Sequence, residues 1–148
     1  MRPSPTRFFT VSSGGLLLVT AAAKLISSSG TAEVLQLGDP LLVLPFKHVL
    51  WIVGVLELIV ARACFIEKRE WLQAGLIAWL ATNFMLYRLG LLLIGYHKPC
   101  ACLGNLIDAL HVSPETADTA AKLILGYLLL GSYATLFWLW RQKRKPSP

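Results

Sequence analysis

The chain has 148 residues, of which 55% are hydrophobic and 15% are charged, with 14 Lys and Arg against 8 Asp and Glu. An average soluble domain is about a quarter charged, so this composition argues against a soluble globular domain, and a mean hydropathy of +0.60 excludes a disordered chain. Three cysteines are too few for a disulfide-rich scaffold, and the absence of a glycine-rich phosphate loop leaves nucleotide chemistry unsupported.

Four stretches are long and apolar enough to cross a membrane, which takes about 20 residues. They cover residues 8–26, 46–65, 71–96 and 120–140. The last includes the uncharged run 123–140, which lacks the regularly spaced polar residues of a water-facing helix. The sequence therefore predicts an all-α protein, a single membrane domain built as an antiparallel bundle of four transmembrane helices. Close helix contacts are expected at Gly14, Gly15, Gly54, Gly90, Gly126 and Gly131.

The distribution of Lys and Arg predicts the orientation of these helices, because positive residues are retained on the cytoplasmic side. One side carries Arg2, Arg7, Arg62, Lys68, Arg69, Arg141, Lys143, Arg144 and Lys145, and the other carries only Lys24, Lys47, Lys98 and Lys122. Both termini are predicted to be cytoplasmic in a bacterial inner membrane, with 141–148 as a basic tail. Anionic lipid headgroups explain that tail, so it does not indicate nucleic acid. The first stretch follows basic residues as a signal peptide does, but it is long for that role, and we expect it to stay as an anchor.

The segment 97–118 is too polar to span and is predicted to form an outer loop before the fourth helix. Ser113, Pro114 and Glu115 indicate a helix start: a hydroxyl cap, a proline at the first position and an acid favoured by the helix dipole. The fourth helix is therefore expected to begin outside the membrane.

Cys100 and Cys102 flank Ala101 in this outer loop, where an oxidising compartment favours disulfides. A bond between cysteines so close in sequence is strained and easily reduced, which suits electron exchange. Lys98 could stabilise a thiolate. A purely structural disulfide is the alternative interpretation. Cys64, near the inner end of the second stretch, is expected to be a small buried residue with a free thiol.

The same loop contains a formal set of metal ligands, namely His97, Cys100, Cys102 and His111. Their spacing does not match the paired pattern of structural zinc sites, although thiolate and imidazole also suit copper. We therefore predict no metal and keep this set as an alternative.

Glu57 and Arg88 are the charged residues predicted to lie deepest in the membrane, where an unpaired charge is costly. Their depths, about 16 and 12 Å from the outer boundary by helical rise, predict an ion pair between them. Asn83 and Tyr87 share a helix face near this pair, and Lys24 is a competing partner for Glu57. A structural pair is one interpretation, and a proton or quinone site is the other.

Several passages resemble the DoxX/MauE-like family of small four-helix membrane proteins. The residues that carry the resemblance are 14–18 with 23–25, then Gly38-Asp39-Pro40 with 53–58, and Cys100-Ala101-Cys102-Leu103-Gly104, with Leu103 where the MauE branch often has Phe. MauE-like proteins are implicated, with a thioredoxin-like partner, in forming disulfides in exported proteins. Other DoxX-like chains are subunits of quinone-linked oxidoreductases. The resemblance implies redox work in the membrane.

Two functions follow as hypotheses. The first is a thiol–disulfide redox protein in which Cys100 and Cys102 exchange electrons with a thioredoxin-like or exported client protein. No cofactor is required for that exchange, and a quinone is a candidate electron acceptor. The second is a non-catalytic subunit or assembly factor of a larger membrane complex, in which the cysteines only stiffen a docking loop.

Overall fold

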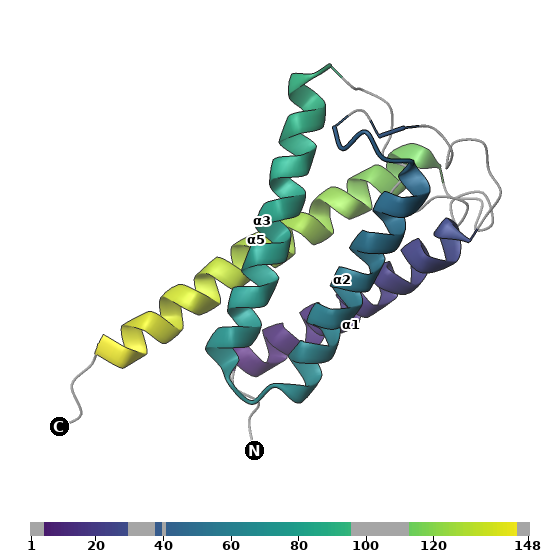
Figure 1. The fold of residues 1–148 in the computed structure, drawn as a ribbon. Helices are drawn as coiled ribbons and strands as arrows, with labels where there is room; N and C mark the ends of the chain where they lie inside the picture. Colours follow the sequence, from purple (N-terminus) through teal and green to yellow (C-terminus); the bar gives the residue numbers. More distant parts are fainter. Residues whose placement is uncertain (1–4, 30–37, 40, 96–112, 145–148) are drawn as a thin grey trace.

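In the part of the chain that the structure describes, four helices are long and apolar enough to cross a membrane. The computed structural model describes residues 5–29, 38–39, 41–95 and 113–144. Its helices are α1 (Pro5–Ser28), α2 (Phe46–Ile66), α3 (Glu70–Leu93) and α5 (Pro114–Arg144) (Figure 1). Across the described ranges the only β-type pairing is an isolated bridge between Gly38 and Pro45. The predicted all-α, four-helix membrane fold is therefore confirmed, while the Cys-x-Cys loop lies outside the described residues.

The helices alternate in direction, so the two ends of the bundle differ. Figure 1 shows the start of α1, the α2–α3 connection and the end of α5 toward one end, here called the inner end. The segment 38–45, the end of α3 and the start of α5 lie toward the other end, here called the outer end. Both described residues that flank the 96–112 segment, Gly95 and Ser113, therefore belong to the outer end.

The bundle is built from two helix pairs. The packing of α1 on α2 is the most extensive, α3 on α5 comes next, and contacts between the pairs are sparser. Small residues allow the first pair to approach closely, since a Cβ on Gly14 would lie 2.9 Å from the Cβ of Cys64 and one on Gly54 would lie 3.0 Å from Leu25. Both helix pairs contribute residues to the core, which consists of Phe9, Leu17, Val60, Ala61, Cys64, Ile77, Leu80, Ala81 and Leu128.

The remaining glycines only partly fulfil the expected role in helix contacts. Gly131 of α5 faces the ring of Phe9 on α1, and Gly90 contacts Leu41 of the 38–45 segment instead of a helix. The expectation was wrong for Gly15 and Gly126, because a Cβ at either position would meet nothing within 4 Å. Those two positions lie on open helix faces.

Two helix boundaries at the outer end, the end of α3 and the start of α5, follow from local chemistry. The third stretch was predicted to reach residue 96, but α3 ends at Leu93, because Gly95 adopts a φ of +71° and its N–H turns back to the Leu92 carbonyl at 3.1 Å. The start of α5 is as predicted: Ser113 Oγ accepts a hydrogen bond from the Thr116 N–H at 3.3 Å, and Pro114 is the first helical residue. At 31 residues, α5 is about 46 Å long, well beyond the hydrocarbon thickness of about 30 Å.

The α2–α3 connection is fixed by one amide side chain. Gln73 Nε2 donates to the carbonyls of Cys64 at 2.9 Å and Glu67 at 2.6 Å, which gives two carbonyls at the end of α2 a hydrogen-bond donor. Cys64 is buried and free, as expected, with 3% of its surface exposed. Gln73 thus ties the start of α3 to the end of α2.

Candidate functional site

The predicted redox residues lie outside the part of the chain that the structure describes. This holds for Cys100, Cys102 and Lys98, and equally for the alternative metal ligands His97 and His111. Within the described ranges, no three His, Cys, Asp or Glu residues group as metal ligands. The assignments in the outer loop stay predictions, and the described residues define the scaffold around it.

A buried ion pair joins α1 to α2. Lys24 Nζ lies 2.8 and 2.9 Å from the two carboxylate oxygens of Glu57, so the pair shares two hydrogen bonds. The Glu57 side chain is 2% exposed and the Lys24 side chain 12%. Lys24 Nζ also lies 5.8 Å from the centre of the Phe84 ring on α3, within cation–π range. A charge at this depth is tolerated because each partner neutralises the other.

The predicted pair between Glu57 and Arg88 is therefore wrong. Arg88 of α3 instead donates to Asp118 of α5, and the second carboxylate oxygen of Asp118 lies 2.6 Å from Lys122 Nζ. The prediction compared depths and treated α2 and α3 as neighbours, whereas α2 packs mainly on α1 and α3 mainly on α5. Each deep charge pairs within its own helix pair, so the competing partner, Lys24, is the one that binds Glu57.

The polar residues expected near that pair also have other partners. Asn83 donates to the Trp79 carbonyl at 2.7 Å, within its own helix. Tyr87 donates to Asp39, which lies in the segment before α2. Neither contact supports a shared network around Glu57.

Asp39 organises the outer segment that leads into α2. Its Oδ1 accepts hydrogen bonds from the backbone N–H groups of Leu41 at 2.8 Å and Leu42 at 3.0 Å, which is an Asx turn, and its Oδ2 accepts from Tyr87. The turn holds Val43 at a φ of 55°, a left-handed conformation rare for a β-branched residue. Asp39 is 2% exposed, so this turn is anchored on α3 by a buried carboxylate.

Replacing Asp39 with alanine should destabilise the protein by about 2–3 kcal/mol, because two backbone donors and the Tyr87 hydroxyl lose one acceptor group. Asp39→Asn should cost about 1 kcal/mol, since its amide oxygen can still accept the two backbone bonds. Unfolding in detergent, followed by circular dichroism, measures both. Tyr87→Phe is the matched control for the α3 contact alone. An Asp39→Ala variant as stable as the wild type would contradict this role of the turn.

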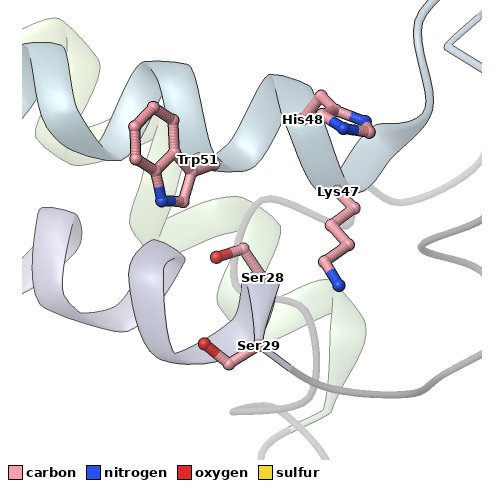
Figure 2. Close-up of a pocket in the computed structure, with 5 residues that line it drawn as sticks. All are labelled: Ser28, Ser29, Lys47, His48 and Trp51. Atoms are coloured by element: carbon pink, nitrogen blue, oxygen red, sulfur yellow. The ribbon is translucent and has the colours of Figure 1, made fainter.

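A cavity of about 510 Å³ lies where the end of α1 meets the start of α2, at the outer end (Figure 2). Figure 2 shows Lys47 extending from α2 toward Ser28 and Ser29 of α1, and Trp51 lying along α2 with its indole nitrogen on the α1 side. In this view, His48 lies on the side of the first turn that faces away from α1. The lining residues are Ser28, Ser29, Lys47, His48 and Trp51. His48 was missed by the sequence reasoning. The signal that could have found it is a Lys-His pair one helical turn before a Trp at a membrane boundary.

The cations at the two ends of the bundle are bound differently. At the outer end, Lys24, Arg88 and Lys122 each pair with a carboxylate. At the inner end, the described Arg and Lys of α5 lie over aromatic rings, with the Arg144 guanidinium 3.8 Å from the centre of the Trp140 ring and Lys143 Nζ 5.8 Å from that of Trp71. The cations at the end of α5 therefore keep their positive charge, whereas Lys24, Arg88 and Lys122 at the outer end are neutralised by carboxylates.

Together, four apolar helices and charges paired inside the bundle define a small multi-pass membrane protein that contacts the lipid bilayer. Residues 4–141 match the family described as methylamine utilisation protein MauE, and the chain belongs to that family. The DoxX-like proteins named in the resemblance form a related but different family. Neither the curated proteins nor the solved structures give a match to this chain.

Proposed function

We propose that this protein is a membrane thiol–disulfide redox protein, in which Cys100 and Cys102 exchange electrons with an extracytoplasmic thioredoxin-like or client protein. The observation that carries the proposal is the MauE match over residues 4–141, which includes the Cys100-Ala101-Cys102 sequence. The family description adds methylamine utilisation as the process in which such an accessory protein would act. The end of α3 and the start of α5, which flank the cysteine segment in the sequence, both lie at the outer end, and this supports the proposed side for Cys100 and Cys102 (Figure 1).

The exchange itself needs no group other than thiols. A thiolate of the client attacks one sulfur of the Cys100–Cys102 disulfide, which forms a mixed disulfide and releases the other cysteine as a thiolate. The second client thiolate then attacks the mixed disulfide, so the client gains a disulfide while Cys100 and Cys102 gain two electrons and two protons. Lys98 would stabilise the leaving thiolate by its charge. Reoxidation passes these electrons to a partner disulfide or to a quinone.

We further propose the bacterial inner membrane as the location, with both termini in the cytoplasm. The nine-to-four asymmetry of Lys and Arg supports this orientation. The contrast between paired cations at the outer end and ring-stacked cations at the inner end supports it as well. In this orientation the cysteine pair faces the oxidising side.

Labelling of intact cells with a membrane-impermeant maleimide tests location and redox state together. Without reductant, no cysteine should react, and mild reductant should make two thiols reactive, those of Cys100 and Cys102. Cys64 serves as the internal control, because a thiol that is 3% exposed at the inner end should react only after denaturation. Reaction only in opened cells would contradict the proposed orientation.

Replacing Cys100 or Cys102 with serine should abolish client oxidation while the protein stays in the membrane. Cys64→Ser is the matched control and should leave client oxidation unchanged. If the double variant Cys100→Ser/Cys102→Ser still supports oxidation of the client protein, the redox role is wrong. If the double variant no longer assembles into a larger membrane complex, while the wild type assembles in both its oxidised and its reduced state, the assembly-factor function takes its place.

A further inference from the structure

On its α2 side, the cavity at the outer end of α1 and α2 is lined by hydrogen-bond donors, and its lining among the described residues includes no carboxylate. Lys47 brings an ammonium group, His48 an imidazole and Trp51 an indole N–H. Within the described ranges, neither Lys47 nor His48 forms an ion pair or a side-chain hydrogen bond. This differs from the other described outer-end cations, all of which bind carboxylates. A donor-rich, cationic lining favours an anion that accepts several hydrogen bonds, as phosphate does.

The backbone around the cavity adds to this preference. Among the described residues, no side chain forms a capping hydrogen bond with the first turn of α2 after Pro45, and the positive end of the helix dipole faces the outer end. On the opposite wall, the hydroxyls of Ser28 and Ser29 donate to the Leu25 carbonyl at 2.7 and 3.2 Å. These bonds use the hydroxyl hydrogens of both serines and offset part of the negative charge at the end of α1, so the attraction for an anion comes from the α2 side of the cavity.

The position of the cavity selects the kind of molecule that carries the phosphate. Trp51 lies one turn deeper than Lys47 and is 57% exposed, as expected of an aromatic ring at the headgroup level. Ile26, one turn before Ser29 on α1, and Ile52, one turn after His48 on α2, are 63% and 46% exposed, so an apolar side chain follows the lining on each helix, one turn deeper. A ligand with a phosphate and an acyl chain satisfies both surfaces, whereas free phosphate uses only the first.

We propose that this cavity binds the phosphate group of an anionic phospholipid, with Lys47 as the principal contact. His48 and Trp51 donate further hydrogen bonds, and the acyl chains lie against Ile26 and Ile52. The bound headgroup would join the end of α1 to the start of α2. This site is independent of the proposed thiol–disulfide function and of Cys100 and Cys102.

Native mass spectrometry of the full chain, released from detergent with one of three probes, tests the proposal. The probes are phosphatidylglycerol, phosphatidylcholine and inorganic phosphate. The wild type should retain one phosphatidylglycerol, bind phosphatidylcholine more weakly because its choline faces Lys47, and bind inorganic phosphate weakest. The double variant Lys47→Gln/His48→Gln should weaken phosphatidylglycerol binding about tenfold, the loss expected for one charge-assisted hydrogen bond.

Two matched variants separate the site from net charge. Lys47→Arg keeps the charge and should retain most of the phosphatidylglycerol binding that the double variant loses. Lys122→Gln removes one positive charge at the same end but on α5, and it should leave binding unchanged. Equal circular dichroism spectra establish that all variants fold. Unchanged phosphatidylglycerol binding in the double variant, or equal retention of both lipids, overturns the proposal. Inorganic phosphate binding that depends on Lys47 without any lipid preference also overturns it, since the site then serves a free anion.

Discussion

Removing one partner of the Lys24–Glu57 pair should destabilise the protein by about 3–5 kcal/mol, the largest effect we expect from a single substitution. Lys24→Met leaves the Glu57 carboxylate, 2% exposed, without its cation, and Glu57→Gln leaves the Lys24 ammonium without a charged acceptor. A buried charge that loses its partner keeps the whole cost of leaving water. Unfolding in detergent or lipid bicelles measures the loss for each variant.

The double variant Lys24→Met/Glu57→Gln should recover most of this stability, because no uncompensated charge remains. A matched control is Lys122→Met, which breaks the pair with Asp118 where the lysine side chain is 63% exposed and should cost at most about 1 kcal/mol. Single and double variants with additive losses would show that Lys24 and Glu57 do not act as a pair.

Gly131→Ala should destabilise the bundle by about 1–3 kcal/mol, because the added methyl group would overlap the ring of Phe9. Phe9 is 8% exposed and packs against Tyr127 with ring centres 5.5 Å apart, so it has little room to move. Tyr127, one turn before Gly131, also shares a hydrogen bond of 2.8 Å with Ser12 of α1. Separating α5 from α1 therefore weakens several contacts together.

Gly126→Ala is the matched control for Gly131→Ala, on the same helix and with the same chemical change. A Cβ at Gly126 would meet nothing within 4 Å, so the variant should be neutral or more stable by up to about 1 kcal/mol, since alanine favours the helix. Thermal unfolding of both variants, compared with that of the wild type, measures the two changes in stability. Equal stability of the two would mean that the Gly131 contact with Phe9 carries no packing energy.

The number and type of helices were predictable because apolar length is a property of each stretch by itself. The start of α5 was predictable for the same reason, since Ser113, Pro114 and Glu115 act within one turn. Pairing between helices was not predictable in this way. The partner of Glu57 is decided by which faces approach, and Gly14 and Gly54 bring α1 against α2, a property that depth along a single helix does not reveal.

The same distinction between local sequence and helix packing applies to the candidate site. The spacing of Cys100 and Cys102 can be read from the sequence. Both cysteines lie outside the described residues, so their role stays a prediction. Asp39 could be noticed only as part of a family passage, because its partner Tyr87 is 48 residues away. The cavity at Lys47 and His48 requires the end of one helix and the start of the next to be placed together.

The division into two helix pairs has a consequence for the order of synthesis and membrane insertion. Lys24 and Glu57 are 33 residues apart and belong to the first two helices, so each finds its counter-charge as soon as α2 has left the ribosome and entered the bilayer. Arg88 gains its counter-charge later, because its partner Asp118 is synthesised only after the whole 96–112 segment. In the orientation proposed above, the second pair would therefore be completed only after the cysteine segment has crossed the membrane.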